Sequence, residues 1–188
     1  MANFEITNGI CVIPEGTTAI EAQAFKNCEE LTSVVIPETV TDIGPWAFAG
    51  CVNLSSVIIP SSVTKIQAGA FQGCEKLTSI EVPASVVDLE HRVFLNCTSL
   101  KTASILGSVK ALESALFGGC AALETVTLGP GAKKVDIGKF TGTFKGCTAI
   151  KVINVPAKKV DYYKKRLPEE MHGLIVELPA EKAASKRK

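Results

Sequence analysis

The sequence lacks most of the features that mark an enzyme, a metal protein or a membrane protein. Its 188 residues include two histidines and one tryptophan, and the formal net charge is +1. No stretch approaches the roughly 18 apolar residues that a membrane-spanning helix needs. The near-neutral charge gives no general attraction to nucleic acids or membranes. We therefore expect no membrane span, no specific nucleic-acid partner and no cofactor.

The two ends of the chain bear on its location and order. The start, "MANFEITNGI", lacks the basic and apolar regions of a signal peptide, so we expect a cytoplasmic protein if Met1 is the native start. Residues 1–155 carry 11 basic and 14 acidic side chains, whereas residues 156–188 carry 9 and 5. The basic excess therefore lies at the C-terminus, where a solvated tail is the usual explanation.

A 23-residue repeat runs through most of the chain. A phenylalanine followed by a cysteine three positions later recurs at this spacing, and only the last pair follows after a longer step. The pairs are Phe25 and Cys28, Phe48 and Cys51, Phe71 and Cys74, Phe94 and Cys97, Phe117 and Cys120, and Phe144 and Cys147. Aliphatic positions keep the same step, and such a period indicates a stack of similar structural units.

Each unit predicts the same series of short elements. Within "LTSVVIPETVTDIGPWAFAGCVN", the opening L-x-x-V-x-I indicates a strand with one buried face. Pro37, Pro60 and Pro83 end this strand because proline cannot donate to the sheet. The stretch "TVTDIG" predicts a second extended segment, and "PWAFAGC" predicts one helical turn. One unit cannot bury its own apolar face, so stacking of the units must form the core.

Both ends of the stack are expected to be capped. Asn8-Gly9 between alternating apolar positions is a hairpin signal, and Val160, Tyr163 and Leu167 have helical spacing before the strand-like "LIVEL". We therefore expect an N-terminal hairpin cap and first rung at 1–14 and repeats at 15–156, with a four-residue insertion before Cys147. A C-terminal cap helix and strand follow at 157–178, and a flexible tail at 179–188.

The repeated pattern V-x-I-P-x-x-V-x-x-I-x-x-x-A-F-x-x-C-x-x-L closely resembles the BspA-like leucine-rich repeats, and residues 9–156 carry it throughout. The resemblance implies an α/β leucine-rich-repeat solenoid. This is a curved parallel β-sheet with short helical turns, and with second short extended segments on the other face. The family also implies bacterial surface or secreted proteins that adhere to host proteins or other cells. Two departures are Leu106 and Gly129, which replace the strand-ending proline.

The ordered cysteines admit four interpretations: disulfides, a metal site, nucleophiles or core packing. Equivalent side chains in stacked rungs point the same way, so neighbouring Cβ atoms stay about 4.8 Å apart and do not approach to the ~3.8 Å of a disulfide. No two cysteines are closer in sequence than Cys11 and Cys28, whereas zinc sites use pairs such as C-x2-C. A reactive cysteine also needs a base or a positive environment. We therefore expect buried thiols that pack as small hydrophobes, with no metal and no catalytic residue.

Two outward-facing columns of the predicted strands are candidates for binding. Their central members are Ser33, Val35, Ser56, Ile58, Ser79 and Glu81, and later rungs carry mainly serine and threonine. Interface hot spots favour tryptophan, tyrosine and arginine, which this face lacks. Serine and threonine are also good solvated strand residues, so a shallow binding surface and a plain solvated face both stay open.

The remaining candidates lie where the repetition lapses. Trp46 takes a position that is not aromatic in the other units, so it either contacts a partner or covers the neighbouring rung. His91 and Arg92 form a second lapse, which also suits a solvated turn. Lys133 and Lys134 lie in the insertion, which, with the basic cap helix, suits an acidic partner or a soluble end of the solenoid.

These features predict a non-catalytic protein-binding module, for adhesion or interaction, with a protein partner of unknown identity. The first alternative is a structural or self-assembling scaffold. A remote alternative is a small enzyme, which would need a pocket with convergent polar groups. We expect a monomer or weak self-association. The resemblance indicates a cell-surface or secreted protein, whereas the unpaired cysteines indicate a reducing interior.

Overall fold

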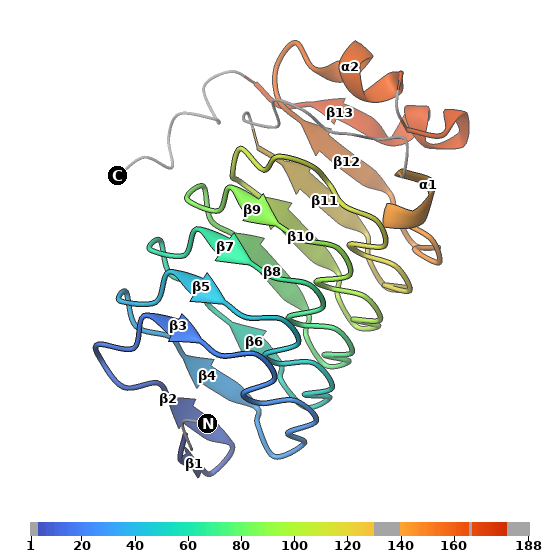
Figure 1. The fold of residues 1–188 in the computed structure, drawn as a ribbon. Coiled ribbons are helices and arrows are strands. Elements are labelled where there is room, and N and C mark those ends of the chain that lie inside the picture. Colours follow the sequence, from blue (N-terminus) through green and yellow to red (C-terminus); the bar gives the residue numbers. More distant parts are fainter. Residues whose placement is uncertain (1–3, 130–139, 166, 180–188) are drawn as a thin grey trace.

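Each 23-residue period forms one turn, or rung, of a parallel β-solenoid, and about seven rungs stack along the molecule (Figure 1). The computed structural model describes residues 4–129, 140–165 and 167–179. The predicted leucine-rich-repeat solenoid is therefore confirmed, and the molecule is mostly sheet. Within the repeats the expected helical turns are single turns closed by hydrogen bonds between residues three apart, such as Cys51 N to Phe48 O at 3.2 Å.

Two rows of strands run up the stack (Figure 1). The long row contains β2 (Ile10–Val12), β4 (Ser33–Val35), β6 (Ser56–Val57), β8 (Ser79–Val82), β10 (Thr102–Ile105), β11 (Thr125–Leu128), β12 (Val152–Val155) and β13 (Ile175–Glu177). The second row contains β3 (Ala19–Ile20), β5 (Asp42–Ile43), β7 (Lys65–Ile66) and β9 (Asp88–Leu89). The second row is the extended segment that "TVTDIG" predicted.

The long row is divided into two hydrogen-bonded sheets, which the sequence did not indicate. One sheet has the order β1-β2-β4-β6, and the other has the order β13-β12-β11-β10-β8. The interruption lies between β6 and β8, and β6 is paired over two residues only, Ser56 and Val57. Ile58 follows β6 outside any strand, and its side chain is 84% exposed.

The ends of the solenoid are closed by short elements. At the N-terminus, β1 (Ile6–Thr7) pairs antiparallel with β2. Asn8 and Gly9 between them have φ values of 51° and 80°, as a type I′ turn requires. At the C-terminus, α1 (Phe140–Thr143), α2 (Val160–Lys164) and the 3-10 helix η1 (Glu169–Leu174) lie before β13. Tyr163 of α2 is 1% exposed and covers the end of the core.

A column of stacked phenylalanine rings runs along the inside of the turns. Successive rings are nearly parallel, with centroids 5.0–5.9 Å apart from Phe25 to Phe144. Phe4 of the hairpin stacks on Phe25 at 5.1 Å and ends the column. The backbone follows the same register, because Phe25 N donates to Ala47 O at 2.7 Å and Phe48 N donates to Ala70 O at 2.8 Å.

The cysteines of the Phe-x-x-Cys pairs form a second internal column beside the rings, whereas Cys11 lies in β2. All seven are free thiols, and Cys51, Cys74, Cys97 and Cys120 have no exposed surface. The expected core packing is therefore confirmed for these four, whereas Cys28 and Cys147 at the ends of the column are partly exposed. The structure adds a hydrogen bond, because each of the four buried Sγ atoms lies 3.0–3.3 Å from the carbonyl oxygen of the phenylalanine in the preceding rung. Burial raises the pKa of the Cys51 thiol to about 12 and also raises the pKa of Cys74.

We predict that the protein loses stability as the pH rises above about 9. A thiol in the unfolded chain ionises near its ordinary pKa, whereas Cys51 and Cys74, whose pKa burial raises, keep their protons in the folded protein. Each such thiol therefore lowers the free energy of unfolding by about 1.4 kcal/mol per pH unit in this range. Urea unfolding at about pH 7.5, 9 and 10 measures the slope. Cys74→Ala has one such thiol fewer and should show a shallower slope; an unchanged slope would contradict the account.

Candidate binding surfaces

The outward-pointing side chains of the long strand row form one continuous surface, which we call the strand face. The register places Ser33 beside Ile10 and Ser56, and Ser79 beside Thr102. A second column contains Val12, Val35, Ile58 and Glu81, at successive 23-residue steps from Val12. The predicted residues Ser33, Val35, Ser56, Ile58, Ser79 and Glu81 therefore lie on one face of the molecule.

The N-terminal end of the strand face is aliphatic and exposed. Ile10, Val12, Val35 and Ile58 are 46%, 63%, 51% and 84% exposed, and we call these four residues the aliphatic patch. Beyond Glu81 the same two columns continue with Thr102, Ser104, Thr125 and Thr127. The exposed aliphatic side chains of the face therefore cluster in its first three rungs, and at the far end the columns finish on Val152 and on Val176, which is 47% exposed.

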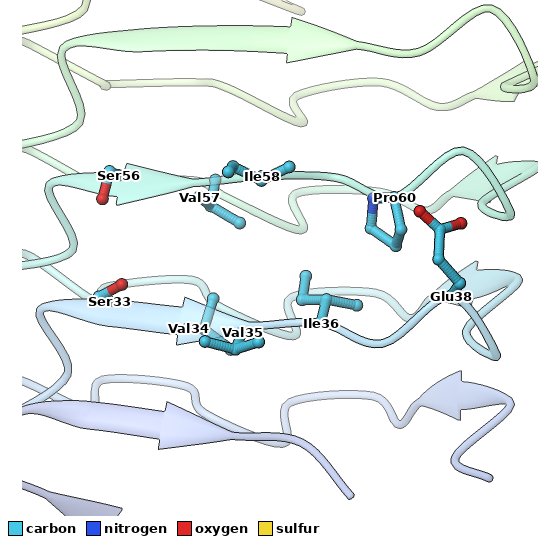
Figure 2. Close-up of a pocket in the computed structure, with 9 residues that line it drawn as sticks. All are labelled: Ser33, Val34, Val35, Ile36, Glu38, Ser56, Val57, Ile58 and Pro60. Atoms are coloured by element: carbon cyan, nitrogen blue, oxygen red, sulfur yellow. The ribbon is translucent and has the colours of Figure 1, made fainter. Parts of the chain in front are cut away.

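A hollow of about 330 Å³ lies over β4 and β6, inside the area of the aliphatic patch. Figure 2 shows the side chains of Val35 and Ile58 beside it, with Glu38 and Pro60 at the end of the strands. One carboxylate oxygen of Glu38 accepts hydrogen bonds from Ser61 Oγ at 3.1 Å and from Ser62 N at 3.2 Å. Neither Glu38 nor the hollow was predicted from the sequence.

Trp46 is partly exposed and also covers the neighbouring rung. Its side chain is 41% exposed, and its backbone has a φ of 53°, which is unfavourable for a bulky residue. A Cβ atom at Gly69 would lie 2.7 Å from both Cδ1 and Nε1 of the Trp46 indole. The indole therefore rests on the backbone of the next rung, as one of the two expectations had it, and contact of its exposed part with a partner stays a prediction.

The Trp46 position has a left-handed backbone in five successive rungs, whereas its equivalent in the last repeat, Gly142, lies in α1 without a positive φ. Gln23, Trp46, Gly69, Arg92 and Ala115 have φ values of 60°, 53°, 63°, 58° and 55°. The sequence shows this column as variable because the requirement falls on the backbone rather than on the side chain. Glycine adopts this conformation without strain, but no residue type in the column is common enough to reveal it.

The other predicted residues do not form one site with the strand face. His91 and Arg92 are exposed in a turn, and Arg92 lies in the column of Trp46 with Gly69 between them. Lys133 and Lys134 lie outside the described residues, so the insertion is not placed. The basic side chains of the cap, Lys158, Lys164 and Lys165, are exposed at the C-terminal end of the stack.

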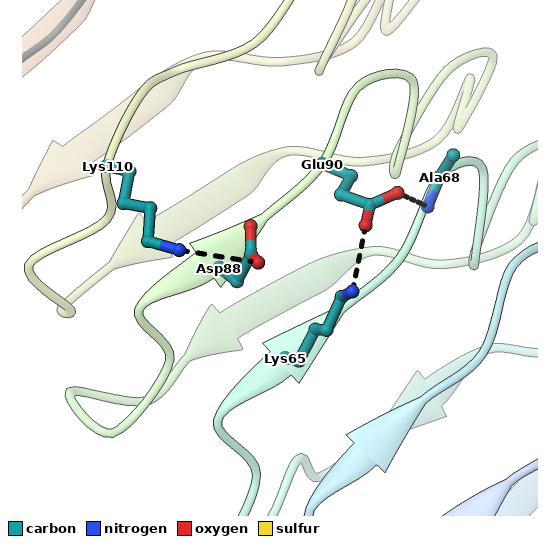
Figure 3. A network of polar contacts seen from close by, with 5 residues as sticks. All are labelled: Lys65, Ala68, Asp88, Glu90 and Lys110. Atoms are coloured by element: carbon teal, nitrogen blue, oxygen red, sulfur yellow. Dashed lines mark hydrogen bonds and ion pairs between the residues drawn. The ribbon is translucent and has the colours of Figure 1, made fainter.

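A polar network lies on the second strand row (Figure 3). Lys65 Nζ is 3.3 Å from Glu90 Oε1, and the other oxygen of Glu90 accepts a hydrogen bond from Ala68 N at 3.0 Å. Lys110 Nζ is 3.6 Å from Asp88 Oδ2. These contacts are solvent-accessible and contribute at most about 1 kcal/mol each. We interpret them as contacts between rungs, because acidic and basic side chains alternate from rung to rung in this row.

Within residues 4–129, 140–165 and 167–179, no group of three or more His, Cys, Asp or Glu side chains is placed to hold a metal ion. In the same ranges no helix is long and apolar enough to cross a membrane. His172 Nε2 lies 3.0 Å from the backbone oxygen of Leu167, so this ring is part of the C-terminal cap.

Comparison with known proteins shows where this architecture recurs. The sequence profile of the BspA type Leucine rich repeat region matches residues 18–151 in six copies. Among solved structures, the Leucine Rich Repeat protein TpLRR of T. pallidum has a TM-score of 0.72 and 27% identity, and the alignment covers 95% of this chain and 85% of that one. No curated protein matches the chain.

Two further structures share the fold at lower identity. The pneumococcal vaccine antigen PcpA has a TM-score of 0.70 at 20% identity, with 90% of this chain and 40% of that chain covered. A leucine rich cell surface protein of Faecalibacterium prausnitzii has a TM-score of 0.58 at 24% identity, with 82% and 34% covered. The chain thus spans about a third of the F. prausnitzii chain, and both likenesses concern the fold alone.

We predict that Gly69→Ala displaces the Trp46 indole and destabilises the fold by about 1–3 kcal/mol. The new methyl group would meet the indole at 2.7 Å, and alanine is strained at a φ of 63°. Because Trp46 is the only tryptophan, its fluorescence emission should move to longer wavelength as the ring becomes more solvated. The control is Gly16→Ala, since Gly16 also has a positive φ but no atom within 4 Å of the added Cβ. If the two variants had the same emission spectrum, the claim that the Trp46 indole rests against Gly69 would be wrong.

Proposed function

This chain belongs to the BspA-type leucine-rich repeat family, and from that premise we propose that it is a non-catalytic protein-interaction module. We propose that the strand face is its binding surface, with the aliphatic patch as the main contact. The observation that carries this proposal is the exposure of four aliphatic side chains in adjacent rungs, up to 84% for Ile58. Contiguous exposed apolar surface is typical of interaction sites.

The aliphatic patch and the rest of the strand face differ in the binding free energy that they can supply. Transfer of apolar surface from water to a partner is worth about 25 cal/mol per Å². The serine and threonine side chains further along the face contribute little of this energy. The patch should therefore supply most of the affinity. The hydroxyl-rich rungs should enlarge the contact area and keep the surface soluble.

A catalytic role is not part of the proposal. A nucleophile needs a base within hydrogen-bonding distance and, for cysteine, a thiolate. Burial raises the pKa of the Cys51 thiol to about 12, and Cys74 is also held in its neutral form. The hollow over β4 and β6 is lined mainly by aliphatic side chains with Glu38 at one end, which suits contact with a partner rather than general acid or base chemistry.

The location of the protein and its organisation are also proposals. One neighbour is described as a cell surface protein and another as a vaccine antigen. We propose, by analogy with them, that this chain acts at a cell surface, with caps at residues 1–14 and 157–178 and the binding rungs between. A scaffold role is the second candidate, because β13 is the edge strand of its sheet and Val176 on it is 47% exposed.

We predict that peptides selected on the wild-type protein from a random phage-displayed library lose binding when the aliphatic patch is made polar. Val35→Thr with Ile58→Thr keeps a β-branched residue at two exposed positions and removes apolar surface. Affinity should fall about ten-fold or more, which corresponds to about 1.4 kcal/mol. Val87→Thr is the matched control, because Val87 is 46% exposed but lies outside the strand face.

Peptides that bind all three proteins equally would rule out the strand face as the binding surface. If no peptide is selected and light scattering shows a mass that rises with protein concentration, the scaffold candidate is favoured. The substitutions lie on exposed positions, so urea unfolding should show little change in stability for any of the variants.

A further inference from the structure

Acidic side chains surround the aliphatic patch. Glu81 occupies the rung after Ile58 in the same column, and it is exposed on β8. Glu38 lies at the end of the strands beside the hollow, where the hydrogen bonds from Ser61 and Ser62 fix one of its oxygens (Figure 2). The patch is therefore bordered by a carboxylate along the stack and by another at the strand end.

A third carboxylate lies at the N-terminal edge of the patch. Ile6 pairs with the buried Cys11, so Ile6 faces the core. Successive residues of an extended chain point to opposite sides, so the preceding residue, Glu5, points to the side of the strand face. Glu5 is exposed and extends the register of the hairpin toward Val12.

Positive charge is scarce at this end of the molecule. The strands β1, β2, β4, β6 and β8 contain no lysine or arginine. Residues 1–60 contain seven acidic side chains and one basic side chain, Lys26. Lys65 in the next rung lies on the second strand row and is paired with Glu90. The electrostatic potential over the aliphatic patch is therefore negative.

We propose that the aliphatic patch receives a basic polypeptide segment, in which aliphatic side chains stand between lysine or arginine residues. This inference rests on the proposed function and adds the chemistry of the partner. The aliphatic side chains of the segment contact Val12, Val35 and Ile58, while its cations lie near Glu5, Glu38 and Glu81. Complementary charge at the rim of an interface speeds association and rejects partners of the wrong sign. Nucleic acids and acidic segments are therefore repelled.

The test compares two fluorescent peptides of about eight residues, one alternating leucine with lysine and the other alternating leucine with glutamate. Their affinities for the full chain are measured by fluorescence anisotropy at about 0.05 M and 0.5 M salt. We expect the lysine peptide to bind at least about ten-fold more tightly at low salt, and the difference to shrink at high salt.

The role of the rim is tested by Glu5→Gln, Glu38→Gln and Glu81→Gln combined in one protein. This variant should lose most of the preference for the lysine peptide. The control combines Glu21→Gln, Glu75→Gln and Glu170→Gln, which changes the net charge equally at exposed positions of turns and the C-terminal cap. The control should keep the preference, and an equal loss in both variants would overturn the inference.

The outcomes separate this inference from the proposed function. If the two peptides bind equally and Val35→Thr with Ile58→Thr weakens both, the basic partner is wrong but the strand face remains the binding surface. If neither peptide depends on Val35 and Ile58, both proposals fail. Circular dichroism of each variant verifies that the fold is retained.

Discussion

The structure depends on one repeated contact, the stacking of identical turns on one another. In each rung the phenylalanine ring lies 5.0–5.9 Å from the next ring, and its amide donates to a carbonyl of the following rung. The cysteine thiol three residues later donates in the opposite direction, to the phenylalanine carbonyl of the preceding rung. The ring, the amide and the thiol all need the same register. The 23-residue period is therefore kept, and the choice of residue at the inward positions is restricted. The outward positions of the strands carry no such restriction.

The turns impose a second constraint, because five successive rungs each have two positions with a left-handed backbone. Asn27 and Asn96 occupy one of them with φ values of 59° and 61°. In the rung after each asparagine the same position is a glycine, Gly50 and Gly119, and a Cβ there would collide with the asparagine side chain. Trp46 and Gly69 repeat this relation at the other position. A side chain in a left-handed position therefore leans on the next rung, and a glycine there makes room for it.

Much of this could be predicted from the sequence, because inward residues recur in every unit. The register of the strands, the buried thiols and the outward placement of Val35, Ile58 and Glu81 all follow from the 23-residue step. Properties that depend on geometry between rungs could not be predicted. The thiols recur in the sequence, but the sequence does not show that they bond to carbonyls. The break after β6 and the hydrogen bonds that fix Glu38 beside the hollow leave no periodic trace. Lys133 and Lys134 belong to the insertion, where the period itself is lost.

The rungs act as interchangeable supports, and the binding surface that we propose occupies only the first three of them. The most direct test of this interchangeability is urea unfolding, followed by circular dichroism, of a chain that lacks residues 84–106, one full period after the aliphatic patch. Pro83 then joins Gly107, which takes the structural position of Ala84. Nearest-neighbour stacking predicts a folded protein with a cooperative transition at a lower urea concentration and a smaller m value. A shortened chain without a cooperative transition would contradict the central claim.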